Sequence, residues 1–330
     1  MENRKFGRLG RSVGVVGLGA WQLGADWGDV SEADAHATLQ AAVDGGVTFI
    51  DTADVYGDGR SEQIIGSFIK TQLSESKPQL TVATKMGRRM AQEPGNYTLD
   101  NFRAWTDRSR ANLGVDTLDL VQLHCPPTPV FSSDAVYDAL DTLVEEKRIR
   151  SYGVSVEKVD EALAAIARPG TASVQIILNA FRLKPLERVL PAAAEAGVGI
   201  IARVPLASGL LSGRYDEQTT FAADDHRNFN RHGEAFDVGE TFSGVPFETG
   251  LEAVRRLRPL VPEALTMAQF ALRWVLDQTG VTVVIPGARN PEQARGNAAV
   301  AGLEPLTDAA KTGVREVYDE LIRPQVHDKW

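Results

Sequence analysis

Short apolar runs alternate with longer amphipathic segments along this chain. The apolar runs are continuous rather than interrupted by polar residues, which is typical of strands buried on both faces. Eight such runs occur, at residues 15–21, 47–51, 80–85, 118–124, 151–156, 173–179, 199–205 and 281–286. Strands that alternate with helical segments indicate βαβ units, so the pattern predicts a parallel sheet.

The segments between the runs carry apolar residues at the spacing of one helix face. This spacing predicts helices within 134–147, 186–196 and 266–278. Ser31 and Thr98 stand where two further helices begin, and both are good N-cap residues because their hydroxyls accept free backbone N–H groups. The chain therefore reads as a regular succession of strands and helices.

Eight strand–helix repeats favour closure as a (β/α)8 TIM barrel over an open doubly wound sheet. Residues KFGRLGRSVGVVGLG, ahead of the first barrel strand, predict an N-terminal β-hairpin. Segment 307–323 predicts an extra C-terminal helix packed outside the barrel. Because no linker, repeat or low-complexity tract divides the sequence, we expect residues 1–330 to form one domain.

The last apolar run follows the seventh at more than twice the earlier spacing. The inserted stretch, 206–265, contains a polar, glycine-bearing loop at 212–246 and a predicted extra helix at 247–258. Long loops in compact domains are usually functional or disordered. We therefore expect this insert to contribute to a binding site.

Charge and cysteine content narrow the range of partners. The net charge of −9 argues against nucleic acid and anionic membrane surfaces. Cys125 is the only cysteine, so no internal disulfide can form and a reducing compartment is favoured. The N-terminal residues lack the apolar core of a signal peptide, and no apolar run is long enough to span a membrane. We therefore expect a cytoplasmic protein.

Four chemically active side chains stand at or near the ends of apolar runs. Asp51, Lys85 and His124 each close a run, and Tyr56 follows Asp51 in DTADVYG. The C-terminal ends of barrel strands meet at one rim, so we expect these side chains to lie together. A phenol has an ordinary pKa of about 10. A nearby ammonium lowers this pKa, and a carboxylate can hold the ammonium in place.

Each of these residues alone has a structural explanation, such as a helix cap, a loop anchor, a solvated strand end or a rim histidine. Four of them on adjacent strands of one rim favour a site that protonates or deprotonates an oxygen. The glycines of GVVGLGAWQLG do not have the GxGxxG spacing, and no helix opens directly after them. A Rossmann dinucleotide fold is therefore a poor interpretation.

Five motifs in this barrel order resemble those of the aldo-keto reductase family. They are FIDTADVYGDGRSEQIIG (49–66), TKMG (84–87), LVQLH (120–124), YGVS (152–155) and IPGARNPEQARGN (285–297). The resemblance covers essentially the whole chain and extends to potassium-channel β subunits. It implies an oxidoreductase that transfers a hydride between NADP(H) and the carbonyl or alcohol of an aldehyde, ketone or sugar.

The resemblance also implies a role for each of the four side chains. Tyr56 would be the general acid in reduction and the general base in oxidation. Lys85, oriented by Asp51, would lower the pKa of Tyr56. His124 would hydrogen-bond the substrate oxygen and fix its orientation. Apart from the resemblance, we expect Trp21, Trp27, Tyr56 and Met86 to form the wall of the substrate pocket.

Cofactor contacts follow from the same motifs. Ser155 and Gln175 match residues that hold the nicotinamide carboxamide. Arg203 matches a position where family members often have an aromatic side chain that stacks on the nicotinamide ring. The guanidinium plane of an arginine can also stack. Val156 stands where family members often have an asparagine, so one amide contact of the family pattern is missing. The stretch 205–215 resembles the loop over the pyrophosphate. The further cofactor-binding candidates in and around these segments are Trp21, Asp51, Pro205, Leu206, Ser208, Gly209, Arg214 and Arg227.

The turn GARNPEQARGN resembles an adenosine-phosphate site at a helix start, where free amides favour anions. Its matching positions are Gly287, Arg289, Gln293 and Asn297. Gly287-Ala288 replaces a lysine-serine pair, and Gln293 replaces a common arginine. Arg289 would then supply the charge for the 2′-phosphate of NADPH, which we favour, or stack on adenine with NADH as the cofactor. We expect no metal site.

Two other functions fit parts of the pattern. A nicotinamide-binding redox-sensing regulatory subunit would bind cofactor with little turnover, but His124 completes a catalytic set that such subunits can lack. A barrel lyase would use Lys85 as a Schiff-base nucleophile. Asp51 and Tyr56 beside Lys85, together with the phosphate-type turn, favour hydride transfer to a small-molecule substrate. The preferred direction, the physiological substrate and a monomeric or homo-oligomeric state stay open.

Overall fold

The computed structural model describes residues 1–24, 30–72 and 79–330, so Trp27 lies outside the described residues. Eight parallel strands form one sheet in sequential order, as the apolar runs predict. Backbone hydrogen bonds from Gly17 N to Val284 O (2.8 Å) and from Gly19 N to Pro286 O (3.0 Å) join its two edges and close the barrel. The strands are β3 (Leu18–Gly19), β4 (Phe49–Asp51), β5 (Thr81–Met86), β6 (Leu120–His124), β7 (Tyr152–Ser155), β8 (Thr171–Ile177), β9 (Gly199–Arg203) and β10 (Val283–Val284).

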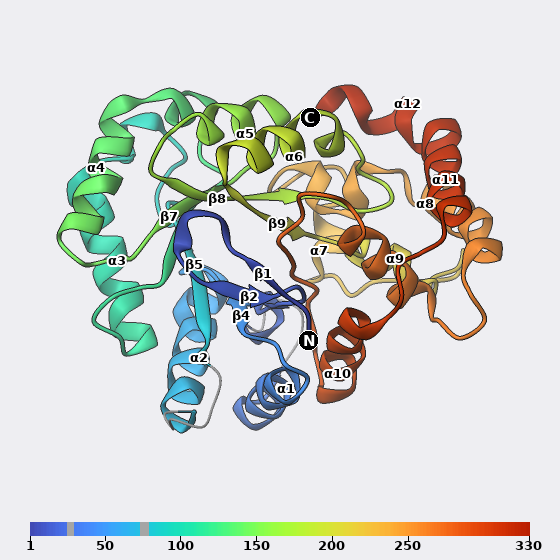
Figure 1. Cartoon of the computed structure of the whole chain (residues 1–330), viewed down its shortest axis with the longest axis horizontal. Helices are drawn as coiled ribbons and strands as arrows, with labels where there is room; N and C mark the ends of the chain where they lie inside the picture. Colours follow the sequence, from blue (N-terminus) through green and yellow to red (C-terminus); the bar gives the residue numbers. More distant parts are fainter. Residues whose placement is uncertain (25–29, 73–78) are drawn as a thin grey trace.

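Helices surround this barrel (Figure 1). Ser31 Oγ accepts the N–H of Asp34 at 3.1 Å and Thr98 Oγ1 that of Asn101 at 3.4 Å, so both predicted N-caps are confirmed. The helices are α1 (Glu32–Asp44), α2 (Arg60–Thr71), α3 (Leu99–Leu113), α4 (Asp134–Glu145), α5 (Val159–Ile166), α6 (Pro185–Ala196), α7 (His226–Phe229), α8 (Phe247–Leu257), α9 (Met267–Leu276), α10 (Pro291–Ala299), α11 (Asp308–Val317) and α12 (Arg323–Val326).

The predicted N-terminal hairpin is present as β1 (Asn3–Lys5) paired antiparallel with β2 (Ser12–Gly14). It lies across the centre of the ring in Figure 1. Phe6 and Val13 are fully buried and pack against the residues inside the barrel, and the ring of Phe6 stacks on that of Phe49 at 5.3 Å. The hairpin therefore closes the N-terminal end of the barrel and leaves the opposite rim for the site.

The insert after β9 contains the predicted helix, observed as α8, and a loop with the single short α-helix α7 in it. The predicted C-terminal helix is also present, as α11. It continues through a π-helical turn, Tyr318–Ile322, into α12, and so ends beyond residue 323. In Figure 1 α8 and α11 lie side by side, outside the barrel. In the described ranges every helix is too short or too polar to cross a lipid bilayer.

Candidate active site

A cavity of about 690 Å³ opens at the C-terminal ends of the barrel strands. Its lining includes Asp51, Tyr56 and His124 at one end and Arg289 and Gln293 at the other. The insert supplies one wall. A cavity of this size is typical of small-molecule and cofactor sites.

The side chain of Lys85, which comes from β5 and is not among the lining residues, reaches Tyr56. Its Nζ forms an ion pair with Asp51, donates to the carbonyl of Thr52 at 2.9 Å and approaches the Tyr56 hydroxyl at 3.4 Å. Both Lys85 and Asp51 are almost fully buried. The acid, the amine and the phenol are therefore brought into one hydrogen-bonded group, although they come from two strand ends and a loop.

The second carboxylate oxygen of Asp51 accepts two side-chain amides. Gln122 Nε2 donates to it at 3.1 Å and Gln175 Nε2 at 2.7 Å. Gln175 lines the cavity, and its register partner on the neighbouring strand is Ser155, which also lines it. The sequence reasoning overlooked Gln122, although a polar residue inside the apolar run LVQLH was a usable signal.

The turn that presents Tyr56 depends on a close backbone approach. Tyr56 begins a short 3-10 helix, Tyr56–Gly59, in which Gly57 has a left-handed φ of 57°. A Cβ at Gly57 would lie 2.1 Å from the carbonyl oxygen of Gly24. Only glycine fits there without a shift of backbone, and this packing sets the turn against the loop that carries Trp21.

Burial controls the proton affinity of Tyr56. It raises the pKa of the phenol above its ordinary value, and Lys85 lowers it by a smaller amount. Lys85 therefore lowers the pKa as expected, but desolvation outweighs the ammonium, so the net pKa of the phenol lies above its ordinary value. Burial opposes the charge of Lys85, but Asp51 and Tyr56 hold its pKa above the ordinary value.

His124 is a neutral imidazole. Burial, helped by the nearby cations Arg88, Lys85 and Arg203, holds its pKa well below the ordinary value. Its ring meets the ring of Tyr56 edge to face, with centroids 6.0 Å apart. Within the described part of the chain its buried Nδ1 has no hydrogen-bond partner. The imidazole therefore has hydrogen-bonding capacity left for a ligand.

Aromatic side chains form a second wall of the cavity. Trp21 stacks on Tyr56 with centroids 5.9 Å apart and contacts His226 and Phe236 of the insert at 5.3 and 6.2 Å. Phe229, which also lines the cavity, is 42% exposed. Met86, expected at this wall, is buried and is absent from the lining residues.

Most of the cofactor candidates line the same cavity. Asn297 and Arg214 do not. Asn297 donates to the carbonyl of Gly287, a lining residue, at 3.1 Å. Arg214 is exposed on the insert. The candidates that line the cavity are Trp21, Asp51, Ser155, Gln175, Arg203, Pro205, Leu206, Ser208, Gly209, Arg227, Gly287, Arg289 and Gln293.

Several of these side chains already have protein partners. Ser208 Oγ donates to the carbonyl of Glu240 at 2.9 Å and accepts the N–H of Phe242 at 3.1 Å, which ties the loop after β9 to the rest of the insert. Arg227 pairs with Asp225, its Nε donating at 2.8 Å. Its guanidinium is thus shared between the cavity and an internal ion pair.

The far end of the cavity contains the start of α10. Asn290 caps this helix by accepting the N–H of Gln293 at 2.9 Å, and Gln293 in turn accepts the N–H of Arg289 at 2.9 Å. The side chain of Gln293 thus closes the turn that the sequence matched to the adenosine phosphate. A helix N-terminus of this kind favours anions.

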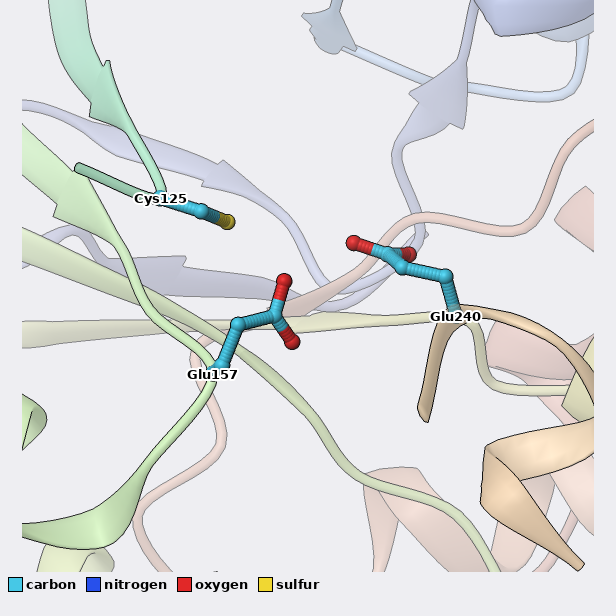
Figure 2. Close-up of side chains that lie close together, drawn as sticks. All are labelled: Cys125, Glu157 and Glu240. Carbon is cyan, nitrogen blue, oxygen red and sulfur yellow. The ribbon is translucent and has the colours of Figure 1, made fainter. Parts of the chain in front are cut away.

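A charged cluster that the sequence did not indicate lies beside His124. Figure 2 shows the side chains of Cys125, Glu157 and Glu240 pointing toward one another, with ligand atoms within 4.8 Å. Arg203 forms ion pairs with both carboxylates, at 3.0 Å to Glu157 and 2.6 Å to Glu240. Burial raises the pKa of the Cys125 thiol to about 12, so the thiol stays protonated. The chain's own cation therefore compensates the acids, and we assign no metal to them.

Comparison with known proteins identifies the family. The sequence model of the Aldo/keto reductase family matches residues 15–319, and the chain belongs to this family of NAD(P)H-dependent oxidoreductases. It is 29% identical to aldo-keto reductase YhdN of Bacillus subtilis (92% of this chain, 89% of that protein). It is 28% identical to aldo-keto reductase yakc [NADP(+)] of Schizosaccharomyces pombe (96% and 91%). It is also 28% identical to a probable voltage-gated potassium channel subunit beta of Arabidopsis thaliana (93% of each).

The fold is also similar to that of solved structures. The chain resembles the solved structure of a glycerol dehydrogenase from Gluconobacter oxydans with a TM-score of 0.78 and 29% identity, over 98% of this chain and 96% of that one. The family and the barrel expected from the sequence are both confirmed.

Proposed function

We propose that this protein transfers a hydride between NADPH and the carbonyl carbon of an aldehyde, ketone or sugar, with Tyr56 as the general acid in reduction and the general base in oxidation. One observation carries the proposal. The ion-paired amine of Lys85 lies 3.4 Å from the Tyr56 hydroxyl, and that phenol lines a cavity next to neutral His124. A phenol, an ammonium and an imidazole around one point suit proton transfer to an oxygen.

When bound, the nicotinamide supplies or accepts the hydride. In reduction, Tyr56 donates its hydroxyl proton to the carbonyl oxygen. The phenolate that forms lies beside the Lys85 ammonium, which stabilises it, while Asp51 holds that ammonium in place. His124, being neutral, hydrogen-bonds the same oxygen and fixes its position. Positioned proton transfer contributes about 10² to 10⁴ in rate, and orientation of the reactants supplies much of the rest.

The cavity fits a dinucleotide. Ser155 and Gln175 are adjacent on β7 and β8 and offer a hydroxyl and an amide to a carboxamide. At the other end, Arg289 and the start of α10 offer positive potential to a phosphate. The bracketed cofactor in the name of the S. pombe relative also supports NADP(H). NADH is the alternative cofactor, with Arg289 stacked on adenine.

Absorbance of the reduced nicotinamide, followed with a panel of aldehydes, ketones and sugars, tests this function. Tyr56→Phe is expected to abolish turnover while cofactor binding is retained. Tyr137→Phe is a matched control, because Tyr137 is a buried tyrosine of α4 whose hydroxyl has no hydrogen-bond partner within the described residues. Equal turnover by Tyr56→Phe and wild type would contradict the proposal. Parallel assays with NADH decide the cofactor.

The similarity to a channel β subunit favours one second candidate, a redox-sensing regulatory subunit. The same assay separates the two functions, because a regulatory subunit would bind cofactor stoichiometrically and turn over no member of the panel. Borohydride trapping of a substrate on Lys85 would instead indicate a lyase.

A further inference from the structure

The ion-paired group of Arg203, Glu157 and Glu240, here called the Arg203 cluster, joins three separate parts of the chain. Arg203 ends β9, Glu157 follows β7, and Glu240 belongs to the insert. The three side chains are only 8%, 12% and 11% exposed. Arg203 also donates to the carbonyl of Val156 at 3.0 Å, so its guanidinium plane is fixed on two sides.

The cluster borders the cavity where the ring is proposed to bind. Arg203 and Glu240 both line it. Arg203 is on the strand next to Gln175, whose register partner is Ser155. A group that contacts Ser155 and Gln175 therefore has the cluster as its immediate neighbour.

We propose that the Arg203 cluster sets the relative affinity of this protein for the oxidised and the reduced nicotinamide, the cation disfavouring the oxidised ring and the two glutamates offsetting it. The inference rests on the proposed function, because a ring held at Ser155 and Gln175 would lie next to Arg203. The oxidised ring has a positive charge and the reduced ring has none. A local charge therefore changes the affinity for one form much more than for the other.

Positive and negative charges are equal in number within and beside the Arg203 cluster. Arg203 and Arg88 are the cations, with Arg88 lying 3.8 Å from Glu157, and Glu240 and Glu157 are the anions. With both glutamates ionised, the charges of the four groups sum to zero. Loss of either negative charge leaves a net charge of plus one. Buried groups interact through a low effective dielectric, so one unit of charge has a large effect there.

The cluster also contains a group that titrates near neutrality. Burial raises the pKa of Glu157 to about 7, with Arg203 and Arg88 lowering it and Glu240 and Asp237 raising it. Glu240 stays ionised, because Arg203 and Arg88 outweigh its burial and hold its pKa below the ordinary value. As pH rises through about 7, Glu157 gains its negative charge and the oxidised ring is expected to bind better relative to the reduced one.

Titration calorimetry of the full chain with NADP⁺ and with NADPH tests the inference through the ratio of the two dissociation constants, oxidised over reduced. Glu157→Gln and Glu240→Gln should each raise this ratio, and Arg203→Gln should lower it, by on the order of tenfold. Arg188→Gln and Asp160→Asn are the charge-matched controls, because they form an exposed ion pair. Neither control should change the ratio.

A ratio that stays constant in all three variants, or moves in the same direction in all three, would overturn the inference. If a variant fails to fold, the wild-type ratio between roughly pH 6 and pH 8 decides, since it should fall as pH rises. The 2′-phosphate titrates equally in both cofactor forms and cancels in the ratio. A wild-type ratio that does not change with pH would count against the inference, whereas a wild-type chain that binds neither form would contradict the proposed function itself.

Discussion

The indole ring of Trp330 covers the guanidinium of Arg182, with 3.5 Å between the ring centroid and Cζ. Trp330 also donates its indole N–H to Asp237 of the insert at 3.0 Å. Arg182 is almost fully buried, and burial lowers its pKa to about 10. One aromatic side chain therefore shields a buried cation and holds the segment that leads to Glu240.

Trp330→Ala is expected to lower the free energy of unfolding by about 3 kcal/mol, since a large buried side chain is lost. Urea denaturation measures this loss. Limited proteolysis should show faster cleavage within 212–246, because Asp237 loses its hydrogen bond from the indole N–H. Trp330→Phe keeps a ring over Arg182 but removes the N–H donor. Its free energy of unfolding should therefore lie between those of wild type and Trp330→Ala. A full loss of stability in Trp330→Phe would show that the hydrogen bond, rather than the ring, is decisive.

Lys85→Met should slow alcohol oxidation by about 10² to 10⁴, because oxidation needs the phenolate of Tyr56 and the ammonium stabilises it. Without that charge, burial, Asp51 and Glu240 act on Tyr56 unopposed and its pKa rises further. The rising limb of kcat against pH should therefore move to higher pH. Lys70→Met, at an exposed position of α2, is the control. An unshifted profile in Lys85→Met would argue against this role of the amine.

Asp54 should make the protein less stable as pH rises from acid toward neutral. Burial and Glu62 raise its pKa from 3.8 to about 7, with Arg89 and Arg108 opposing. Between these values the folded state holds a proton that the unfolded state has lost, so the free energy of unfolding falls with pH, by roughly 2–4 kcal/mol in total.

Asp54→Asn should reduce this dependence, leaving the share that Glu157 contributes, and be more stable than wild type near pH 8. Urea denaturation at acid and at mildly alkaline pH measures it, with exposed Asp138→Asn as the control. An Asp54→Asn chain that keeps the wild-type slope would show that other groups cause the pH dependence.

Gly57→Ala should impair both folding and turnover. The added Cβ would meet the carbonyl of Gly24, and the left-handed φ would be strained. We expect a loss of about 1–3 kcal/mol in stability together with reduced kcat, because Tyr56 is the neighbouring residue. Gly95→Ala, where a Cβ meets nothing within 4 Å, is the control. Equal stability and turnover in both variants would contradict the packing argument.

The barrel and the rim residues were predictable from the sequence for one physical reason. Parallel strands buried on both faces leave continuous apolar runs, and the polar residue that ends each run must lie at the common rim. Asp51, Lys85 and His124 were located this way. The same logic did not locate Gln122, because its polar side chain interrupts a buried run and does not end it.

The Arg203 cluster was not predictable, because its members are brought together only by the folded insert. Glu240 comes from a stretch with no periodic pattern, and nothing in the sequence links it to Glu157. The lowering of the Tyr56 pKa by Lys85 was predictable, but the net direction of that pKa was not, for a related reason. It depends on how deeply the phenol is desolvated, which the order of residues does not reveal.

The hairpin that closes the N-terminal end of the barrel affects how molecules enter and leave the cavity. With Phe6 and Val13 filling that end, the Tyr56 phenol lines the cavity that opens at the opposite rim. In the proposed function, cofactor and substrate would both enter through this opening, which the insert borders. Exchanging the insert among relatives would therefore retune which molecules enter and how fast products depart, while the proton-transfer groups on the strand ends stay as they are.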